Sequence, residues 1–301
     1  WKISFLISES DILKCFQHLV DSSYHKESIL IGSGDDAAVI DTQERKLIHS
    51  IDISKLGVHF HRDNRPEDIA IRSISTALSD LAGMGSYPAF ITIGLTSNIE
   101  EISWYERFSD GIKEVLDEFK IDLVGGDVTK GELNICVSVF GYPFHKPILR
   151  SGAKVGDSVF ISGKLGEARQ GLQDWLNKKQ SNYLEKYLQP KPQFKKAKQI
   201  SAFATSCIDI SDGLIKDLGD ICKQSCVGAE LNFENIPIHN DYNDLNYGDD
   251  YELCFTAPSK HNNHFIDLGF YLIGEIKKEK SLIIKDQGNI IEFNKCSRWD
   301  V

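Results

Sequence analysis

The chain has 301 residues, enough for one large domain or two of ordinary size with a substantial core in either case. Hydrophobic residues make up 41% and charged residues 26%, the balance of an ordinary globular protein. The formal net charge of −10 argues against a nucleic-acid partner, since proteins that bind the phosphate backbone carry a basic face. We expect no membrane partner either, because no apolar run approaches the ~20 residues of a membrane span and the beginning lacks a signal-peptide pattern. Seven cysteines, an odd number and several of them within apolar stretches, favour buried free thiols in a cytoplasmic protein.

The first half of the sequence alternates helical and extended patterns. Apolar residues at helical spacing predict a helix from Ser8 to about Tyr24, a long helix that begins near Pro66 and is ended by Gly83 and Gly85, and a third from Ser103 to Phe119. Strands are predicted at Ala37–Ile40, Lys46–Ile53, Ala89–Leu95, Asp122–Val124 and Leu133–Tyr142. This β-α-β-α-β order predicts an α+β layer.

The second half predicts another sheet after a join at Pro143–Pro147. One helix is expected to open within Gly163–Gly171 and another to run from Gly213 to about Cys222, while the basic segment Lys178–Lys198 is typical of a solvated helix–turn–helix. The strands of this second sheet are predicted at Ser158–Ser162, Ile208–Ile210, Ala229–Phe233, Tyr251–Thr256, Tyr271–Ile276, Leu282–Lys285 and Ile290–Phe293.

Aspartates beside apolar or glycine-rich segments are the main chemical signal. Asp35 and Asp36 lie between a glycine-rich turn and an apolar run, although adjacent carboxylates repel each other and are costly to bury. Similar settings recur at Asp52, Asp80, Asp127, Asp209 and Asp212. Mg²⁺ prefers hard oxygen ligands and is usually held by one or two carboxylates plus substrate phosphates. The set therefore indicates an anionic pocket in which several cations bridge a polyphosphate, although any single member, taken alone, is more typical of a helix cap or a turn.

Two further features suit nucleotide phosphates. The Gly125-Gly126-Asp127 stretch predicts a turn whose backbone amides are uncovered beside a carboxylate. Arg150, at the join, can clamp a phosphate bidentately, or it is an ordinary surface arginine. A P-loop signature is absent from the sequence, and the loose dinucleotide match that begins at Gly32 lacks the helix that it requires.

Six sequence blocks together resemble thiamine-monophosphate kinases, in the order of that family and over nearly the whole chain. They are Gly34-Asp35-Asp36-Ala37-Ala38, Leu78-Ser79-Asp80-Leu81-Ala82-Gly83-Met84-Gly85, Gly125-Gly126-Asp127, Arg150-Ser151-Gly152-Ala153-Lys154, Ile208-Asp209-Ile210-Ser211-Asp212-Gly213-Leu214 and Gly248-Asp249-Asp250-Tyr251-Glu252-Leu253-Cys254-Phe255. Such an ordered set is far more specific than a single motif.

The resemblance implies the two-domain α+β and α/β fold shared with aminoimidazole-ribonucleotide synthetase. Residues 1–145 would form an N-terminal α+β domain that binds ATP and magnesium and dimerises through its sheet, and residues 146–301 a C-terminal α/β domain that completes the active site. The implied reaction is ATP-dependent phosphorylation of thiamine monophosphate to thiamine diphosphate, a step of thiamine diphosphate biosynthesis. Since the acceptor phosphate is already anionic, we expect no general base but direct in-line transfer assisted by several Mg²⁺ ions.

The same resemblance implies a set of site residues. The magnesium ligands would be Asp36, Ser50, Ile51 through its main-chain carbonyl, Asp52, Asp80, Asp127, Asp209 and Asp212; the ATP contacts would be Gly126, Asp127, Arg150 and Ser211; and the contacts to thiamine monophosphate would be His59, Asp249 and Trp299. Because successive residues of a strand point to opposite faces, Asp35 and Asp36 cannot share a metal ion equally if the segment is extended, and the resemblance favours Asp36 as the ligand. The chain departs from the family at five positions, with Ile51 for Thr, Asp249 for Glu, Val128 for Thr, Lys130 for Arg and Asp220 for His.

Two other interpretations stay open at this point. One is another ATP-dependent synthetase of the same superfamily, although Cys15 lies in a predicted helix rather than in the reactive loop of a selenophosphate synthetase. The hydrogenase-maturation dehydratase would end in a cysteine tail, whereas this sequence ends with Cys296 followed by five other residues. The other interpretation is a non-catalytic protein that binds divalent metal ions.

Overall fold

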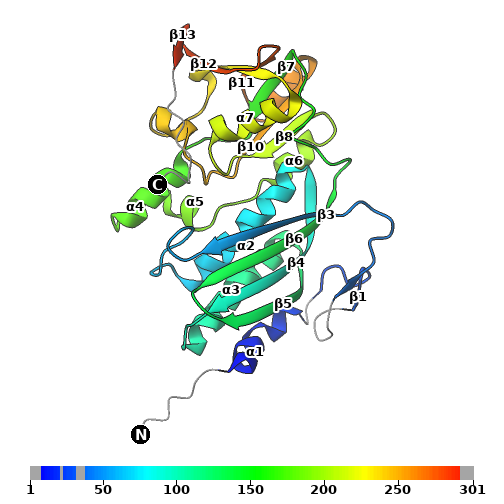
Figure 1. The fold of residues 1–301 in the computed structure, drawn as a ribbon, viewed down its shortest axis with the longest axis vertical. Coiled ribbons are helices and arrows are strands. Elements are labelled where there is room, and N and C mark those ends of the chain that lie inside the picture. Colours follow the sequence, from blue (N-terminus) through cyan, green and yellow to red (C-terminus); the bar gives the residue numbers. More distant parts are fainter. Residues whose placement is uncertain (1–7, 21–22, 32–37, 292–301) are drawn as a thin grey trace. The chain divides into compact units, whose positions relative to one another are not determined.

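The computed structural model describes residues 8–20, 23–31 and 38–291. Contacts divide the chain into two compact units (Figure 1): unit 1 comprises residues 1–81 and 87–142, and unit 2 comprises residues 82–86 and 143–301. The assignment of functions to residues 1–145 and 146–301 stays a prediction.

Unit 1 is built on a four-stranded sheet of order β3-β6-β4-β5. Its strands are β3 (Ile48–Lys55), β4 (Ser86–Ser97), β5 (Asp122–Lys130) and β6 (Asn134–Pro143), and its helices are α1 (Glu9–Val20), α2 (Pro66–Gly83) and α3 (Ile102–Phe119). A separate two-stranded sheet joins β1 (Ile29–Ile31) to β2 (Val39–Ile40). Helix α2 begins at Pro66, where a proline costs no hydrogen bond, and its apolar side chains at Ile69, Ile74 and Leu78 are buried.

The two faces of this sheet differ in character. Along β3 the side chains of Ser50 and Asp52 lie on the same face as Val139 and Val137 of β6, which are buried. Ile51 and Ile53 point to the other face, where they are 56% and 51% exposed. One face of the sheet therefore carries the core, and the other presents large apolar side chains.

Unit 2 contains a seven-stranded sheet of order β13-β12-β9-β11-β7-β10-β8. The strands are β7 (Asp157–Ile161), β8 (Ser206–Asp209), β9 (Gly228–Asn232), β10 (Leu253–Pro258), β11 (Tyr271–Lys277), β12 (Leu282–Asp286) and β13 (Asn289–Ile291). The helices are α4 (Glu167–Leu176), α5 (Leu184–Leu188), α6 (Phe194–Ile200), α7 (Leu214–Ser225) and α8 (Asn262–Asp267), with 3₁₀ turns at Phe233–Asn235, Tyr242–Leu245 and Ser259–His261. The pairing of β12 with β9 is parallel, and the other strand pairs of this sheet are antiparallel.

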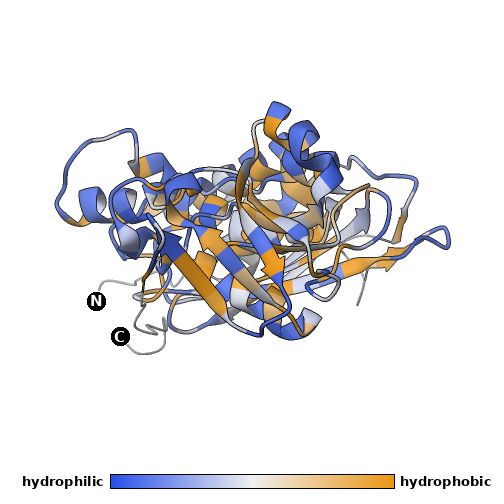
Figure 2. Ribbon diagram, turned by 90° about the horizontal axis from the view of Figure 1, so that it is seen from above, coloured by the Kyte–Doolittle hydropathy of each residue, from blue (hydrophilic) through white to orange (hydrophobic). Residues whose placement is uncertain are grey.

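Two hydrophobic clusters hold the sheet of unit 2. Successive side chains of β7 belong to different clusters. Val159 and Ile161 pack with Leu218 of α7 in one cluster, and Phe160 packs with Ile200 of α6 and Phe265 of α8 in the other. Figure 2 shows both hydrophobic and hydrophilic stretches along the helices, as expected for helices that pack one face against a sheet. In the part of the chain that the structure describes, no helix has the length and apolar character needed to cross a membrane.

The structure corrects several predicted boundaries. Helix α1 ends at Val20 rather than near Tyr24, because the backbone N–H groups of Tyr24 and His25 donate to the carboxylate of Asp122, at 2.5 and 2.6 Å. The basic segment 178–198 contains two successive helices as predicted, the short α5 and most of α6, but it is not simply solvated, because Tyr187 and Ala197 are buried. The strand expected from Tyr251 begins at Leu253.

Candidate active site

In unit 1, β3 and α2 bring together part of the predicted ligand set. The hydroxyl of Ser50 donates to Oδ2 of Asp80 at 2.5 Å, so these two side chains meet between β3 and the last turn of α2. Asp52 lies two residues farther along β3 on the same face, where Oδ1 accepts the backbone N–H of Ile53 at 2.8 Å. Ile51 directs its side chain to the opposite face, so only its main chain can serve this site.

The predicted Gly-Gly-Asp turn is wrong, because these residues form the middle of β5. Gly126 pairs with Ile93 and Asp127 with Gly94 of β4 in parallel register. Since β5 is an edge strand, the backbone groups on its outer side have no partner strand in this sheet. Gly126 is required there, as a Cβ atom would lie 2.5 Å from the carbonyl oxygen of Ile93.

A pocket of about 160 Å³ lies against this part of β5. It is lined mainly by apolar side chains from α1, α3, β4 and β5, together with Gly125, Gly126 and Asp127: the apolar members are Leu13, Phe16, Val20, Ile93, Leu95, Phe108, Ile112, Leu123 and Val128. Among the described residues, no cationic side chain pairs with Asp127 or with Asp52. The pocket thus combines apolar side chains with a carboxylate, that of Asp127, which has no counter-ion within the described ranges.

His59 is held at both its ring and its main chain. Its Nδ1 accepts the backbone N–H of Lys55 at 3.1 Å, which assigns the ring proton to Nε2 in the neutral tautomer. Nε of Arg72, a residue of α2 that is only 2% exposed, donates to the His59 carbonyl oxygen at 2.9 Å. Arg72 was not predicted from the sequence. An arginine within a helical pattern does not indicate which main-chain carbonyl its side chain will bind in the folded protein.

In unit 2, the loop between β8 and α7 carries three predicted site residues. Asp209 ends β8 and is buried, and Ser211 and Asp212 follow it. The backbone N–H groups of Asp212 and Gly213 donate to Oδ2 of Asp217 at 3.0 and 3.1 Å. Burial raises the pKa of Asp217 to about 7, and hydrogen bonds from the backbone at Asp212 and Ser211 oppose that shift. The carboxylate of Asp212 itself pairs with Lys216 of the next helical turn.

The segment from Gly248 to Glu252, here called the 248–252 segment, runs alongside that loop. The N–H of Asp249 donates to Ser211 O at 3.0 Å, and the N–H of Tyr251 donates to Ile210 O at 2.9 Å. The approach is close, because a Cβ atom on Gly248 would lie 1.9 Å from Ser211 O. Asp249, a predicted substrate contact, is therefore adjacent to Ser211, a predicted nucleotide contact.

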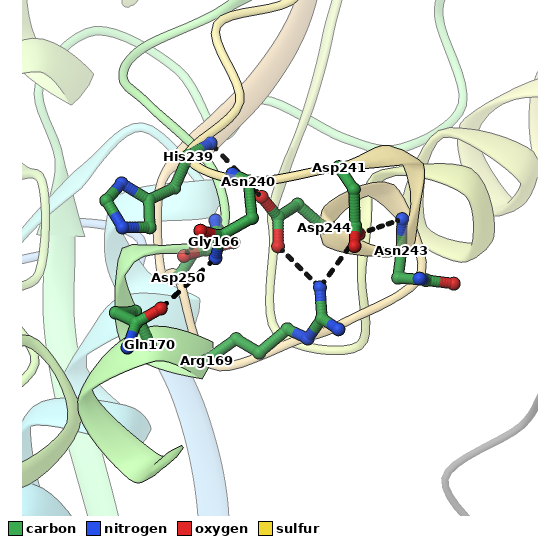
Figure 3. A network of polar contacts seen from close by, with 9 residues as sticks. All are labelled: Gly166, Arg169, Gln170, His239, Asn240, Asp241, Asn243, Asp244 and Asp250. Carbon is green, nitrogen blue, oxygen red and sulfur yellow. Dashed lines mark hydrogen bonds and ion pairs between the residues drawn. The ribbon is translucent and has the colours of Figure 1, made fainter. Parts of the chain in front are cut away.

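A polar network fixes the other side of the 248–252 segment (Figure 3). Both carboxylate oxygens of Asp250 accept the N–H of Gly166 at 3.0 Å, directly before α4. Arg169 of α4 donates to Asp241 and Asp244 at 3.0 and 2.9 Å. No sequence pattern indicates this network, because Asp250 and Gly166 are 84 positions apart.

Arg150 lies on the surface of unit 2 with its carbonyl oxygen fixed. The hydroxyl of Ser225, at the end of α7, donates to Arg150 O at 3.0 Å and accepts the N–H groups of Gly152 and Ala153 at 3.0 and 3.1 Å. No carboxylate among the described residues pairs with the Arg150 guanidinium. The side chain is thus exposed and available for an anionic ligand.

The structure brings together only part of the predicted set of site residues. Ser50 meets Asp80 in unit 1, and Ser211 meets Asp249 in unit 2. Asp35, Asp36 and Trp299 lie outside the described residues. Within the described ranges, no three His, Cys, Asp or Glu side chains gather as a metal site on their own. Because the predicted ligands come from both units and include Asp36, the assignment of the metal ligands stays a prediction.

Comparison with known proteins gives the family. Residues 34–142 match the model of the AIR synthase related protein, N-terminal domain. A thiamine-monophosphate kinase of Buchnera aphidicola (subsp. Schizaphis graminum) is 39% identical over 250 residues, which cover 76% of this chain and 77% of the relative. The chain belongs to the thiamine-monophosphate kinase family. The enzyme of that name from Escherichia coli K12 is 36% identical over 248 residues, with 76% of each chain covered.

Solved structures of this kinase family extend the similarity to nearly the whole chain. The crystal structure of thiamine-monophosphate kinase from Stenotrophomonas maltophilia K279a has a TM-score of 0.83 and 30% identity, covering 95% of this chain and 98% of that one. AaThiL complexed with AMPPCP and TMP has a TM-score of 0.76 and 29% identity, covering 96% and 98%. The fold is shared more widely, since E. coli HypE has a TM-score of 0.79 at 15% identity, covering 95% and 97%. The fold class predicted from sequence, a two-domain fold like that of aminoimidazole-ribonucleotide synthetase, is confirmed.

The partly buried Asp250 makes stability depend on pH. Burial, with smaller contributions from the carboxylates of Glu252 and Asp249, raises its pKa well above the usual value, and the N–H groups of Gly166 and Ala168 oppose this. Between the ordinary aspartate pKa, near ~4, and the raised value, the folded state keeps a proton that the unfolded state has released, so the free energy of unfolding falls as the pH rises. Asp250→Asn removes this titration while keeping an acceptor for Gly166. In urea titrations at pH 5 and pH 8, we expect the variant to gain stability relative to wild type at the higher pH; an equal difference at both pH values would contradict this.

Proposed function

We propose that the protein transfers the γ-phosphoryl group of ATP to thiamine monophosphate and releases thiamine diphosphate, as a cytoplasmic step of thiamine diphosphate biosynthesis. The observation that carries the proposal is the similarity over both units to thiamine-monophosphate kinases, including AaThiL complexed with AMPPCP and TMP. Within the described residues, the sequence blocks of that family fall on the end of α2, on the middle of β5, on residues 150–154, on the end of β8 with the loop after it, and on the 248–252 segment with the start of β10.

The chemistry of the donor set fits magnesium. The proposed ligands are hydroxyl, carboxylate and carbonyl oxygens only, which suit a hard cation, and Asp52 and Asp127 have no cationic partner among the described residues. The side chains of Ser50, Asp52, Asp80, Asp127, Asp209 and Asp212, the main chain of Ile51, and Asp36 would hold the ions. When bound, Mg²⁺ would neutralise the charge of the facing phosphates.

Nucleotide contacts are proposed on both units. In unit 1, the apolar pocket beside Gly126 and Asp127 suits a planar base, with backbone groups of the edge strand close to it. In unit 2, Ser211 and Arg150 supply a hydroxyl and an exposed guanidinium for phosphate oxygens. None of these groups needs to accept a proton from the substrate.

The substrate contacts proposed are His59, Asp249 and Trp299. The tautomer of His59 makes Nε2 a donor, which suits a phosphate oxygen. The Asp249 carboxylate repels a phosphate and suits the cationic thiazolium or the amino group of the pyrimidine ring. The phosphate oxygen of the acceptor is anionic at neutral pH, so the residues align the two phosphates for direct in-line attack rather than remove a proton.

The proposal is tested by measuring ATP consumption with purified protein in the presence of Mg²⁺. We expect ADP and thiamine diphosphate to appear in equal amounts when thiamine monophosphate is present, and no ADP with thiamine alone. ATP consumption that does not depend on thiamine monophosphate would favour another synthetase of the superfamily. Magnesium binding without any turnover would favour a non-catalytic metal-binding protein.

We also propose a homodimer that forms through the open face of the unit 1 sheet. Large apolar side chains on a sheet face, at Ile51 and Ile53, are typical of an interface. Ile53→Glu is therefore expected to convert the dimer to a monomer in sedimentation velocity, because it buries a charge in that interface. Ile290→Glu is the control, since Ile290 is 62% exposed in unit 2. A monomeric wild type, or a dimeric Ile53→Glu, would contradict the proposal.

A further inference from the structure

We propose that Tyr251 is a positioning residue that fixes the orientation of the Asp249 carboxylate. The inference rests on the proposed function, in which Asp249 contacts thiamine monophosphate. Its basis is the hydrogen bond that the Tyr251 hydroxyl donates to Oδ1 of Asp249, at 3.1 Å. Both residues are buried, with Tyr251 6% and Asp249 5% exposed.

The backbone of the 248–252 segment is shaped to make this contact. Asp249 and Tyr251 both have a left-handed conformation, with φ of +69° and +50°. Such values are rare for residues other than glycine and exceptional for a bulky side chain such as tyrosine. Strained backbone of this kind persists where the surrounding structure enforces it, and it concentrates at binding and catalytic sites.

The main chain around the pair is fastened independently of the tyrosine hydroxyl. The N–H groups of Asp249 and Tyr251 donate to Ser211 and Ile210, and the carboxylate of Asp250 holds Gly166 on the other side. Removing the hydroxyl therefore leaves the path of the chain supported by these backbone contacts. What it removes is a charge-assisted hydrogen bond that selects one orientation of the carboxylate.

This arrangement separates binding of the acceptor from binding of ATP. Asp249 faces the substrate in the proposal, whereas Ser211, which accepts the Asp249 amide through its main chain, stays in place. Without this hydrogen bond, the carboxylate spends a smaller part of its time in the orientation that contacts its ligand, so the affinity for the acceptor falls. The alignment of ATP does not depend on that rotation.

Tyr251→Phe in the full chain tests the inference, because it keeps the ring and removes the hydroxyl. We expect the KM for thiamine monophosphate to rise about tenfold, as for the loss of one hydrogen bond to a charged group, with kcat and the KM for ATP changed less than about twofold. Tyr242→Phe is the matched control: it removes the hydrogen bond from Tyr242 to Asp286 at 2.5 Å on the surface of the same unit, and we expect unchanged kinetics.

A double-mutant cycle then shows whether Tyr251 acts through Asp249. In an Asp249→Asn background, Tyr251→Phe is expected to add little to the KM for thiamine monophosphate. The inference would be overturned by an unchanged KM for thiamine monophosphate in Tyr251→Phe, or by an equal increase in that KM in both backgrounds. It would also be overturned if Tyr251→Phe lowered kcat, ATP affinity and melting temperature together. Absence of turnover in the wild type would instead overturn the proposed function, so the two failures are distinct.

Discussion

Asp127→Asn is expected to reduce the turnover of thiamine monophosphate by about 10³-fold or more at saturating Mg²⁺, and Asp52→Asn to act similarly. In the proposed site both carboxylates bind cations that offset charge in the transition state, and phosphoryl transfer depends mainly on such stabilisation and on alignment. Folding should be nearly unaffected, within about 0.5 kcal/mol for Asp127, because its side chain is exposed and has no ion-pair partner among the described residues.

The measurement is steady-state turnover together with urea unfolding of each variant. Asp110→Asn on α3 is the control, since Asp110 is also an exposed aspartate of unit 1, and we expect wild-type kinetics. A wild-type rate in Asp127→Asn or Asp52→Asn at saturating Mg²⁺ would refute the assignment of these residues as ligands.

Gly248→Ala is expected to destabilise the protein by about 3 kcal/mol and to lower its activity. The added Cβ would lie 1.9 Å from Ser211 O and 2.9 Å from Asp212 Cα, and both are backbone atoms that cannot move aside alone. The 248–252 segment must then separate from the loop between β8 and α7, which breaks the hydrogen bond from Asp249 N to Ser211 O.

Gly219→Ala is the matched control for this effect. Gly219 lies within α7, and a Cβ atom added there would meet nothing within 4 Å. Alanine has the higher helix propensity, so this variant should gain about 0.5–1 kcal/mol. Urea unfolding of both variants measures the contrast, and equal stabilities for Gly248→Ala and wild type would show that the close approach does not constrain the fold.

Much of unit 1 could be predicted from the sequence, because its long helices carry strong local signals. Helices α2 and α3 have apolar residues at helical spacing over 18 residues each, and Pro66 marks the beginning of α2. The long strands β3 and β6 also lie close to their predicted ranges. The hydrophobic periodicity of these helices and strands can be read from neighbouring residues, and the tertiary contacts of the fold favour the same secondary structure.

The errors arose where distant residues decide the local conformation. Gly125 and Gly126 have low strand propensity, yet pairing with β4 places them within β5. The alternation that begins at Tyr251 predicts a strand, but the hydrogen bond from the Tyr251 N–H to Ile210 fastens that tyrosine in the left-handed region. Asp122 accepts the N–H of Tyr24 from 98 positions away, and Tyr24 lies outside α1. No spacing rule could have found these contacts.

For the candidate site, the sequence indicated which residue types to examine but not how they are supported. Carboxylates beside apolar segments were recognisable individually, and the ordered blocks related them to one family. The groups that support the predicted site residues, namely Asp217, Tyr251 and Arg72, were not recognisable, because each acts on a main-chain or side-chain atom that only the folded chain brings near.

Helix α7 also acts as a spacer within unit 2. Its 12 residues span about 18 Å, given a rise of ~1.5 Å per residue. Asp217 holds the loop that contains Ser211 at the beginning of this helix, and Ser225 holds Arg150 at its end. The main chains of these two proposed nucleotide contacts are thus kept apart by one rigid element. A nucleotide touched by both would therefore extend along α7, with its separate parts recognised at the two ends.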